Sequence, residues 1–200
     1  MRGLTLHLVR HASHDLLGRV LAGRSDVPLN AKGLREAELL ADVFVRQQVS
    51  AVISSPQLRA RATAKPIASR CGIPFQLNPG LDEINFGAWT GMTFDDLGRD
   101  PGWQVFNTAR SLAAVPGGET MLAAQARAIA TVQRICEQLP GGVMVMVSHA
   151  DIIKAILLHI LGMPLDMMRR LEIAPASRSV VFFTGGDCVV RAINIPVTEP

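Results

Sequence analysis

Short, mainly apolar runs mark the strands that the sequence predicts. Residues 4–9, 49–53 and 143–147 form such runs, and each stops abruptly at polar residues. Runs of this length and composition are typical of strands buried on both faces, as in a parallel sheet covered by helices. Two further β-rich runs, 179–184 and 189–195, flank a Gly-Gly-Asp turn and predict a hairpin near the C-terminus.

Segments with apolar residues at helical spacing alternate with these strands. An N-cap at Asn30 begins one helix, and a second is expected over 58–69. Pro66 lies inside the second helix, where it predicts a kink or an earlier end. Two more helices are expected over 120–138 and from 148 to about 161.

This alternation predicts the α/β class, as a three-layer α/β/α sandwich with a mostly parallel central sheet. The length fits a single catalytic domain over 1–200, and no internal repeat is present. Between about 75 and 118 the chain is irregular and rich in glycine, and so long a segment without regular structure is usually functional. We expect it to cover or shape a site, and Glu119 and Thr120 to cap the following helix.

Polar residues that could bind an anion or take part in a reaction follow three of the strands. Arg10 and His11 follow the first, Arg59 lies in the segment after the second, and His149 follows the third. Ligands of parallel sheets bind beyond the carboxyl ends of the strands, so these side chains should converge. Two guanidiniums suit a tetrahedral oxyanion, and the helix that begins near His149 would add its N-terminal amides. Two histidines then supply a nucleophile and a donor for phosphoryl transfer.

Composition narrows the classes of partner and compartment. The formal net charge is +3, aromatic residues make up 4% and no basic block occurs, so a nucleic-acid partner is not expected. The three cysteines form no paired motif, which favours a cytoplasmic location. No run reaches the roughly 18 apolar residues that a membrane span needs, so no membrane partner is expected either. The sequence leaves the oligomeric state open, a homodimer included.

At this point the residues resemble a known family, the histidine phosphatase superfamily, also called the phosphoglycerate mutase-like family. Six motifs occur in the family's order across nearly the whole chain. They are Arg10-His11-Ala12; Gly23 through Asp26-Val27-Pro28-Leu29-Asn30; Ser54-Ser55-Pro56 through Arg59-Ala60; Leu81-Asp82-Glu83 with Phe86-Gly87; Pro116-Gly117-Gly118-Glu119-Thr120; and Val147-Ser148-His149.

The resemblance implies a role for each of these site residues. His11 would attack phosphorus and form a phosphohistidine, with no metal or other cofactor. Arg10, Arg59, His149 and the helix start at Ala150 would bind the phosphoryl oxygens. Glu83 would protonate the leaving oxygen and then deprotonate the water that breaks the intermediate, which requires a raised pKa for this carboxyl. Its neighbour Asp82 is interpreted as a surface acid.

Three positions depart from the family pattern. Ala12 replaces the usual Gly, which matters only if the backbone there needs a positive φ. Leu17 lies where many members place an Asn that contacts phosphate. Ser13 stands where cofactor-dependent mutases carry Glu, which favours a phosphatase over a mutase.

The resemblance therefore implies a phosphomonoester hydrolase acting on a small phosphorylated metabolite, with a phosphomutase on the same scaffold as the alternative. Two hypotheses from other functional classes remain. One is a metallohydrolase, because His and Asp cluster near positions 11–15 and 149–151. The other is a phosphate-binding module without catalysis. Nearby arginines would repel a cation, and binding alone would not need Glu83. Candidate substrate contacts are His14, Arg19, Gly23 and Arg24, whose arginines suggest a second anionic group on the substrate.

Overall fold

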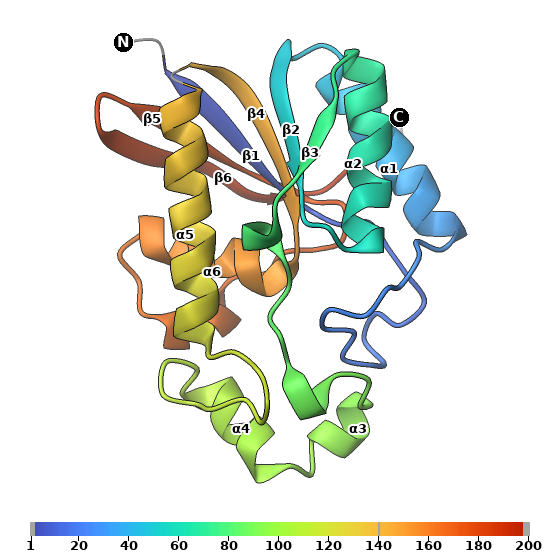
Figure 1. The fold of residues 1–200 in the computed structure, drawn as a ribbon, viewed down its shortest axis with the longest axis vertical. Coiled ribbons are helices and arrows are strands. Elements are labelled where there is room, and N and C mark those ends of the chain that lie inside the picture. Colours follow the sequence, from blue (N-terminus) through green and yellow to red (C-terminus); the bar gives the residue numbers. More distant parts are fainter. Residues whose placement is uncertain (1–2, 140, 198–200) are drawn as a thin grey trace.

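The computed structural model describes residues 3–139 and 141–197. Its centre is a six-stranded sheet in the order β3-β2-β4-β1-β5-β6 (Figure 1). The first four strands in that order run parallel, and β5 and β6 form the antiparallel hairpin that the sequence predicts. The strands are β1 (Leu4–Arg10), β2 (Val49–Ser54), β3 (Phe75–Leu77), β4 (Gly142–Ser148), β5 (Arg178–Thr184) and β6 (Asp187–Ile195).

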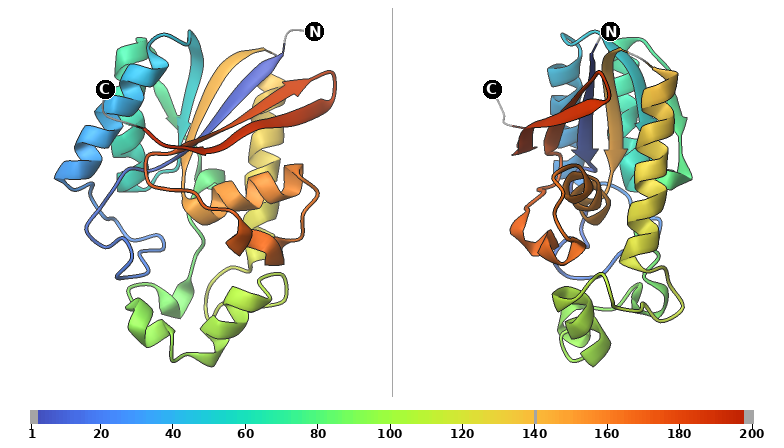
Figure 2. Two further views of the ribbon diagram at one scale, coloured as in Figure 1. Left: turned by 180° about the vertical axis from the view of Figure 1, so that it is seen from behind. Right: turned by 90° about the vertical axis from the view of Figure 1, so that its left-hand side faces the viewer.

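Helices cover both faces of this sheet, which confirms the predicted α/β/α sandwich. Helices α1 and α2 lie on one face and α5 on the other, as the right-hand view of Figure 2 shows. The α-helices are α1 (Ala31–Phe44), α2 (Leu58–Cys71), α3 (Phe94–Leu97), α4 (Pro101–Thr108), α5 (Met121–Gln138) and α6 (Ala150–Ile160). Three short 3-10 helices are η1 (Pro79–Leu81), η2 (Gly87–Trp89) and η3 (Leu165–Arg170).

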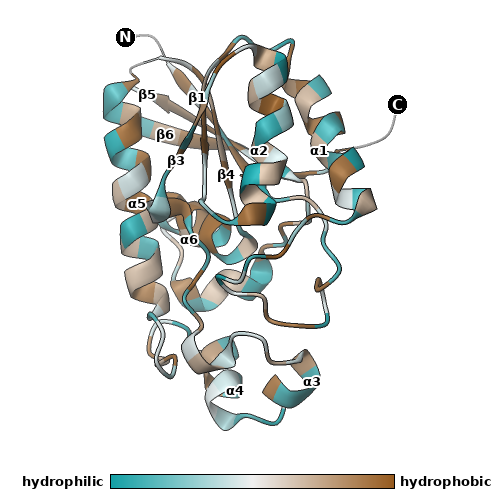
Figure 3. Cartoon of the chain, turned by 45° about the vertical axis from the view of Figure 1, so that its right-hand side comes forward, coloured by the Kyte–Doolittle hydropathy of each residue, from teal (hydrophilic) through white to brown (hydrophobic). Residues whose placement is uncertain are grey.

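Side chains that alternate between the two faces of the sheet form two separate hydrophobic cores. In β1, Leu6 and Leu8 pack into the core under α5 and α6, whereas Val9 packs into the core under α1 and α2. In β4, Met146 and Val147 divide in the same way. Successive side chains of a strand point to opposite faces, so a mainly apolar strand supplies both cores at once. In Figure 3 the strands are mostly hydrophobic in colour while the outer helices carry mixed bands.

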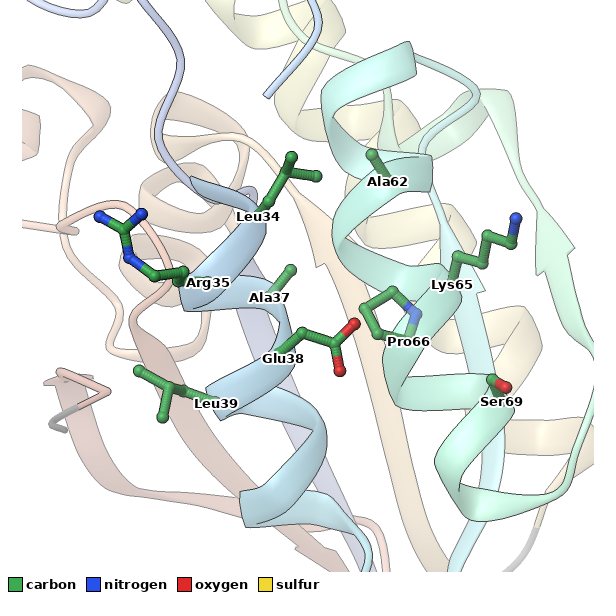
Figure 4. Close-up of a pocket in the computed structure, with 9 residues that line it drawn as sticks. All are labelled: Leu34, Arg35, Ala37, Glu38, Leu39, Ala62, Lys65, Pro66 and Ser69. Carbon is green, nitrogen blue, oxygen red and sulfur yellow. The ribbon is translucent and has the colours of Figure 1, made fainter. Parts of the chain in front are cut away.

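Helix α2 continues through Pro66, so the early end that the sequence allowed does not occur. Buried residues on both sides of the proline, including Ala64 and Ile67, anchor the helix, and Gly72 ends it with a φ of 69°. Proline in a helix interior costs about 3 kcal/mol, which this packing outweighs. The ring lines a groove between α1 and α2 together with Ala62 and Ala37 (Figure 4).

The segment from about 75 to 118 is more ordered than its composition suggested. It holds β3, η1, η2, α3 and α4, and its aromatic residues pack against one another as part of the core under α5 and α6. Trp89 packs edge-on against Trp103 with 5.4 Å between ring centroids, and Trp103 stacks on Phe106 at 5.5 Å. Asp100 caps α4 and accepts a hydrogen bond from the Trp89 indole at 2.9 Å. Aromatic packing and side-chain caps therefore replace long helices as the source of order here.

In the described ranges, no helix has the length and apolar character needed to cross a membrane.

Candidate active site

The parallel strands end in register at one edge of the sheet. Arg10 of β1 lies opposite Ser148 of β4, and Val147 lies opposite Ser54 of β2. The residues that follow are tied to the same edge, because the His11 amide donates to the Ser148 carbonyl at 2.9 Å. The three polar clusters that the sequence singled out therefore meet in one place.

His11 is buried with a defined tautomer. Its Nδ1 lies 2.9 Å from the Ala12 carbonyl, which can only accept a hydrogen bond, so Nδ1 carries the proton and Nε2 keeps a lone pair. Burial, followed by the fields of Arg59 and Arg10, holds the pKa of His11 well below its ordinary value. The imidazole is therefore neutral at physiological pH and nucleophilic at Nε2.

The backbone after His11 is ordinary, which resolves the departure at position 12. In the described part of the chain the non-glycine residues with positive φ are Gln48, Ala176 and Asn194, and Ala12 is not one of them. The amide of Ala12 donates a hydrogen bond to the Thr63 hydroxyl at 2.9 Å. Alanine therefore serves here as well as glycine would.

Arg59 and Arg10 are held by backbone carbonyls. Arg59 is 1% exposed and donates to the carbonyls of Gly23 at 2.6 Å and Ser25 at 3.0 Å. Arg10 donates to the Ile173 carbonyl at 2.7 Å. The Nε atoms of both arginines are buried and have no acceptor among the described residues. Buried cationic donors without a partner are costly, and an anionic ligand would satisfy them.

His149 has the opposite tautomer to His11. Its Nδ1 lies 3.1 Å from the Arg59 guanidinium, which can only donate, so the proton is on Nε2 and is donated to the Ser55 hydroxyl at 2.9 Å. Ser55 in turn donates to Asp82 at 2.8 Å. Asp82 is thus half-buried and engaged, which corrects its interpretation as a surface acid. Burial raises its pKa.

Glu83 lies beside these groups, with one carboxylate oxygen 4.0 Å from His149 Nδ1. Burial is the largest cause that raises its pKa to about 7, and the negative charge of Asp151 adds to the shift. The carbonyl of Glu83 accepts from Arg24 at 2.9 Å and from Arg127 at 3.1 Å. Glu83 is therefore held through its own backbone, and its carboxyl can exchange a proton near neutral pH.

The candidate substrate contacts divide into two groups. His14 and Gly23 line a cavity of about 130 Å³ with Arg10, His11, Arg59 and Glu83. Arg19 is exposed and is not among the lining residues. Arg24 is engaged by Glu83 and, at 2.8 Å, by Glu119. Neither arginine therefore faces the cavity as a free cation.

Several functional neighbours were missed by sequence reasoning. Ser55 and Asp82 lie within the family motifs, but nothing in the sequence shows that they contact each other, and Arg127 carries no signal that separates it from an ordinary helix residue. Glu119 was expected to cap α5, but Thr120 alone accepts from the first turn, while Glu119 pairs with Arg127 at 2.7 Å. In the described residues no three His, Cys, Asp or Glu side chains are grouped so as to hold a metal ion.

Comparison with known proteins assigns the family. The sequence model of the histidine phosphatase superfamily (branch 1) matches residues 6–196, so the chain belongs to this superfamily of phosphatases and mutases. It is 33% identical over 182 residues to a protein named probable phosphoglycerate mutase GpmB of Yersinia pestis, covering 89% of this chain and 84% of that one.

Solved structures agree with this assignment. The fold is similar to that of YhfR of Bacillus stearothermophilus, with a TM-score of 0.90, 28% identity, and coverage of 94% of this chain and 96% of that one. It is also similar to a phosphoserine phosphatase of Entamoeba histolytica crystallised with phosphoserine, with a TM-score of 0.86, 26% identity and 96% coverage of each chain.

Proposed function

We propose that this protein hydrolyses a small phosphomonoester through a phosphohistidine on Nε2 of His11, without a metal. The observation that carries the proposal is the hydrogen bond from His11 Nδ1 to the Ala12 carbonyl. It leaves the Nε2 lone pair free in a buried pocket that also holds two guanidiniums. Nucleophile and phosphoryl clamp thus come together, which a mere binding site would not need.

The first half-reaction forms a bond between Nε2 and phosphorus while the bond from phosphorus to the alcohol oxygen breaks. Glu83 gives its proton to that oxygen, so the alcohol leaves neutral. In the second half-reaction Glu83 takes a proton from water, the oxygen of which attacks phosphorus. The bond between Nε2 and phosphorus breaks, phosphate departs and Glu83 is protonated again.

Arg10, Arg59 and His149 stabilise the charge on the transferring group, together with the amide of Ala150. Ala150 is the first residue of α6, where amides lack partners within the helix and the helix dipole is positive. Such preorganised donors contribute most of the rate enhancement in phosphoryl transfer. The unpartnered Nε atoms of both arginines support this assignment.

A phosphomutase is the second candidate, in which the phosphohistidine returns its group to another oxygen of the substrate. The name of the Yersinia pestis relative favours it. Ser13 favours the phosphatase, because both its amide and its hydroxyl donate to Glu36 of α1, at 2.8 and 3.0 Å. The side chain at this position is thus directed to α1 and offers no acid to the substrate.

Replacement of the nucleophile tests the proposal directly. In His11→Ala we expect phosphate release from phosphomonoesters to fall by at least about 10³-fold, and no covalent phosphoryl adduct after rapid quenching and mass spectrometry. His159→Ala, on the exposed side of α6, is the matched control and keeps both signals. Wild-type activity in His11→Ala would refute the mechanism. Positional isomerisation exceeding phosphate release in the wild type would favour the mutase.

A further inference from the structure

The cavity beyond the phosphoryl clamp is apolar. Its polar side chains are those of Arg10, His11, His14, Arg59 and Glu83, whereas the rest of the lining comes from the first loop and from the segment at 86–94. The apolar lining residues are Leu17, Val20, Leu21, Ala22, Phe86 and Phe94.

These apolar residues are held in place by backbone pairing between two distant segments. Leu21 donates to the Met92 carbonyl and accepts from Gly91, both at 2.9 Å, and the Phe94 amide donates to the Arg19 carbonyl at 3.1 Å. The first loop and the segment at 91–94 thus form one wall of the cavity. Because backbone hydrogen bonds hold this wall in place, its apolar side chains are a fixed part of the cavity lining.

Positive charge is confined to the phosphoryl end of the cavity. Among the described residues that line it, only Arg10 and Arg59 carry a guanidinium or ammonium group. Burial lowers the pKa of His14 to about 4, so its ring is neutral at physiological pH. Outside the lining, Arg19 is exposed and Arg24 is already paired with Glu119.

We infer that the natural substrate is the phosphomonoester of an uncharged, largely apolar alcohol. This inference rests on the proposed function and specifies its substrate class. A second anionic group on the leaving alcohol would be placed against aliphatic and aromatic side chains without a partner, which is strongly unfavourable. An apolar alcohol is stabilised by the same surface. The second-anion hypothesis drawn from Arg19 and Arg24 is therefore not supported by the geometry.

A matched pair of esters tests this substrate class. Phenyl phosphate and 4-carboxyphenyl phosphate differ by one carboxylate, and the carboxylated phenol is the better leaving group, so intrinsic reactivity opposes the expected result. With the full chain we expect kcat/KM for phenyl phosphate to be higher by about 10- to 100-fold, as is usual for a mismatched site. Equal or greater efficiency with 4-carboxyphenyl phosphate would overturn the inference.

A charge placed in the apolar wall should change this preference. Leu17→Arg is expected to reduce the ratio of the two kcat/KM values by about tenfold, mainly by lowering KM for the carboxylated ester. Leu34→Arg introduces the same charge on α1, in the groove of Figure 4, where the leucine is 56% exposed, and should leave the ratio unchanged. An equal response to both substitutions would overturn the inference.

A milder variant guards against misfolding. Phe94 is 38% exposed at the rim, so Phe94→Ala should raise KM for phenyl phosphate severalfold and leave KM for methyl phosphate unchanged. Parallel changes in both KM values would contradict an apolar contact with the alcohol. If the wild type hydrolyses no ester, methyl phosphate included, the proposed function fails too. A preference for the carboxylated ester with normal turnover overturns only the substrate class.

Discussion

Two histidines with opposite tautomers, His11 and His149, lie close together, with 5.2 Å between ring centroids. A carbonyl fixes the proton of His11 on Nδ1, and Ser55 accepts the proton that His149 carries on Nε2. For Nδ1 of His149 to donate to a phosphoryl oxygen, it must gain a proton or change tautomer. The Nε2 proton can then pass through the Ser55 hydroxyl to Asp82, whose raised pKa favours taking it up. Protonation of His149 is thus coupled to a carboxyl that does not touch the substrate.

The proposed role of Glu83 predicts a pH dependence of turnover. Its pKa is raised to about 7, so the protonated form that the first half-reaction needs is lost as the pH rises through that value. We expect kcat for alkyl phosphates to decline above about pH 7. Glu83→Gln should remove this decline and lower kcat by about 10²- to 10⁴-fold. The loss of kcat/KM, which reports the first half-reaction alone, should be much smaller for 4-nitrophenyl phosphate, since its leaving group needs no proton.

The comparison of pH–rate profiles with the two classes of ester provides the check. A profile that stays flat to strongly alkaline pH in the wild type, or an equal loss for both leaving groups, would contradict Glu83 as the acid.

The convergence of three site residues was predictable because they stand at or directly after the end of an apolar strand. Arg10, His11 and His149 stand at strand ends, where chain direction alone places them at one edge. Ser55 and Asp82 were not predictable as partners, since their contact depends on how two loops fold beside each other. The engagement of Arg24 by Glu119 is likewise a product of tertiary packing across distant segments.

At the scale of elements, helix α5 holds in place the loop that carries Glu83. Arg127 of α5 donates to the carbonyls of Gly80 at 3.0 Å and Glu83 at 3.1 Å, and it pairs with Glu119. Glu119 in turn accepts from the Asn85 amide at 2.9 Å. One arginine thus links a helix to both ends of the turn around Glu83, without reaching the cavity itself.

Arg127→Met should loosen this turn while preserving the apolar stem of the side chain. Because the carboxyl of Glu83 would lose its fixed orientation, we expect kcat to fall by about tenfold with little change in KM. Arg134→Met, on the exposed side of the same helix, is the control and should keep wild-type kcat. Steady-state kinetics beside thermal unfolding separates the two effects. A loss of stability with unchanged kcat would refute a positioning role.

Long elements were predictable from sequence, and short ones were not. The apolar runs that became β1, β2 and β4 had enough length for their pattern to be specific. Helices α3 and α4 begin at the side-chain caps Thr93 and Asp100, but the Gly-rich composition around them obscured both signals. Helix α2 survives Pro66 because tertiary packing outweighs the local propensity.

At the scale of the whole molecule, burial of neutral histidines makes stability depend on pH. His7 of β1 packs edge-on against Phe44, and burial lowers its pKa to about 4 from an ordinary 6.5. Between these two pH values the His7 imidazole is mostly protonated in the unfolded chain but mostly neutral in the folded chain. The free energy of unfolding therefore falls as the pH falls from about 6.5 to 4, and the buried His11 and His149 add to the effect.

His7→Leu removes one of the buried histidines whose protonation differs between the folded and the unfolded chain. Its Nδ1 has no partner among the described residues, so the substitution leaves no donor or acceptor stranded. We expect the free energy of unfolding to decline less steeply below pH 6.5, by up to about 1.4 kcal/mol per pH unit, which corresponds to one proton. Urea titrations at pH 7, 6 and 5 measure the slope. A slope equal to that of the wild type would contradict the assignment.

The place of β4 in the sheet has a consequence for biosynthesis. β4 lies between β2 and β1, although it is made long after both. A ribosome-bound chain that already carries His11 and Arg59 therefore lacks the strand that joins their supports, and His149 follows only when that strand has been made. Insertion of a late central strand is a non-local and slow event. Nascent chains should thus remain inert toward phosphate esters until synthesis is nearly finished, and enzymatic competence then arrives in a single step.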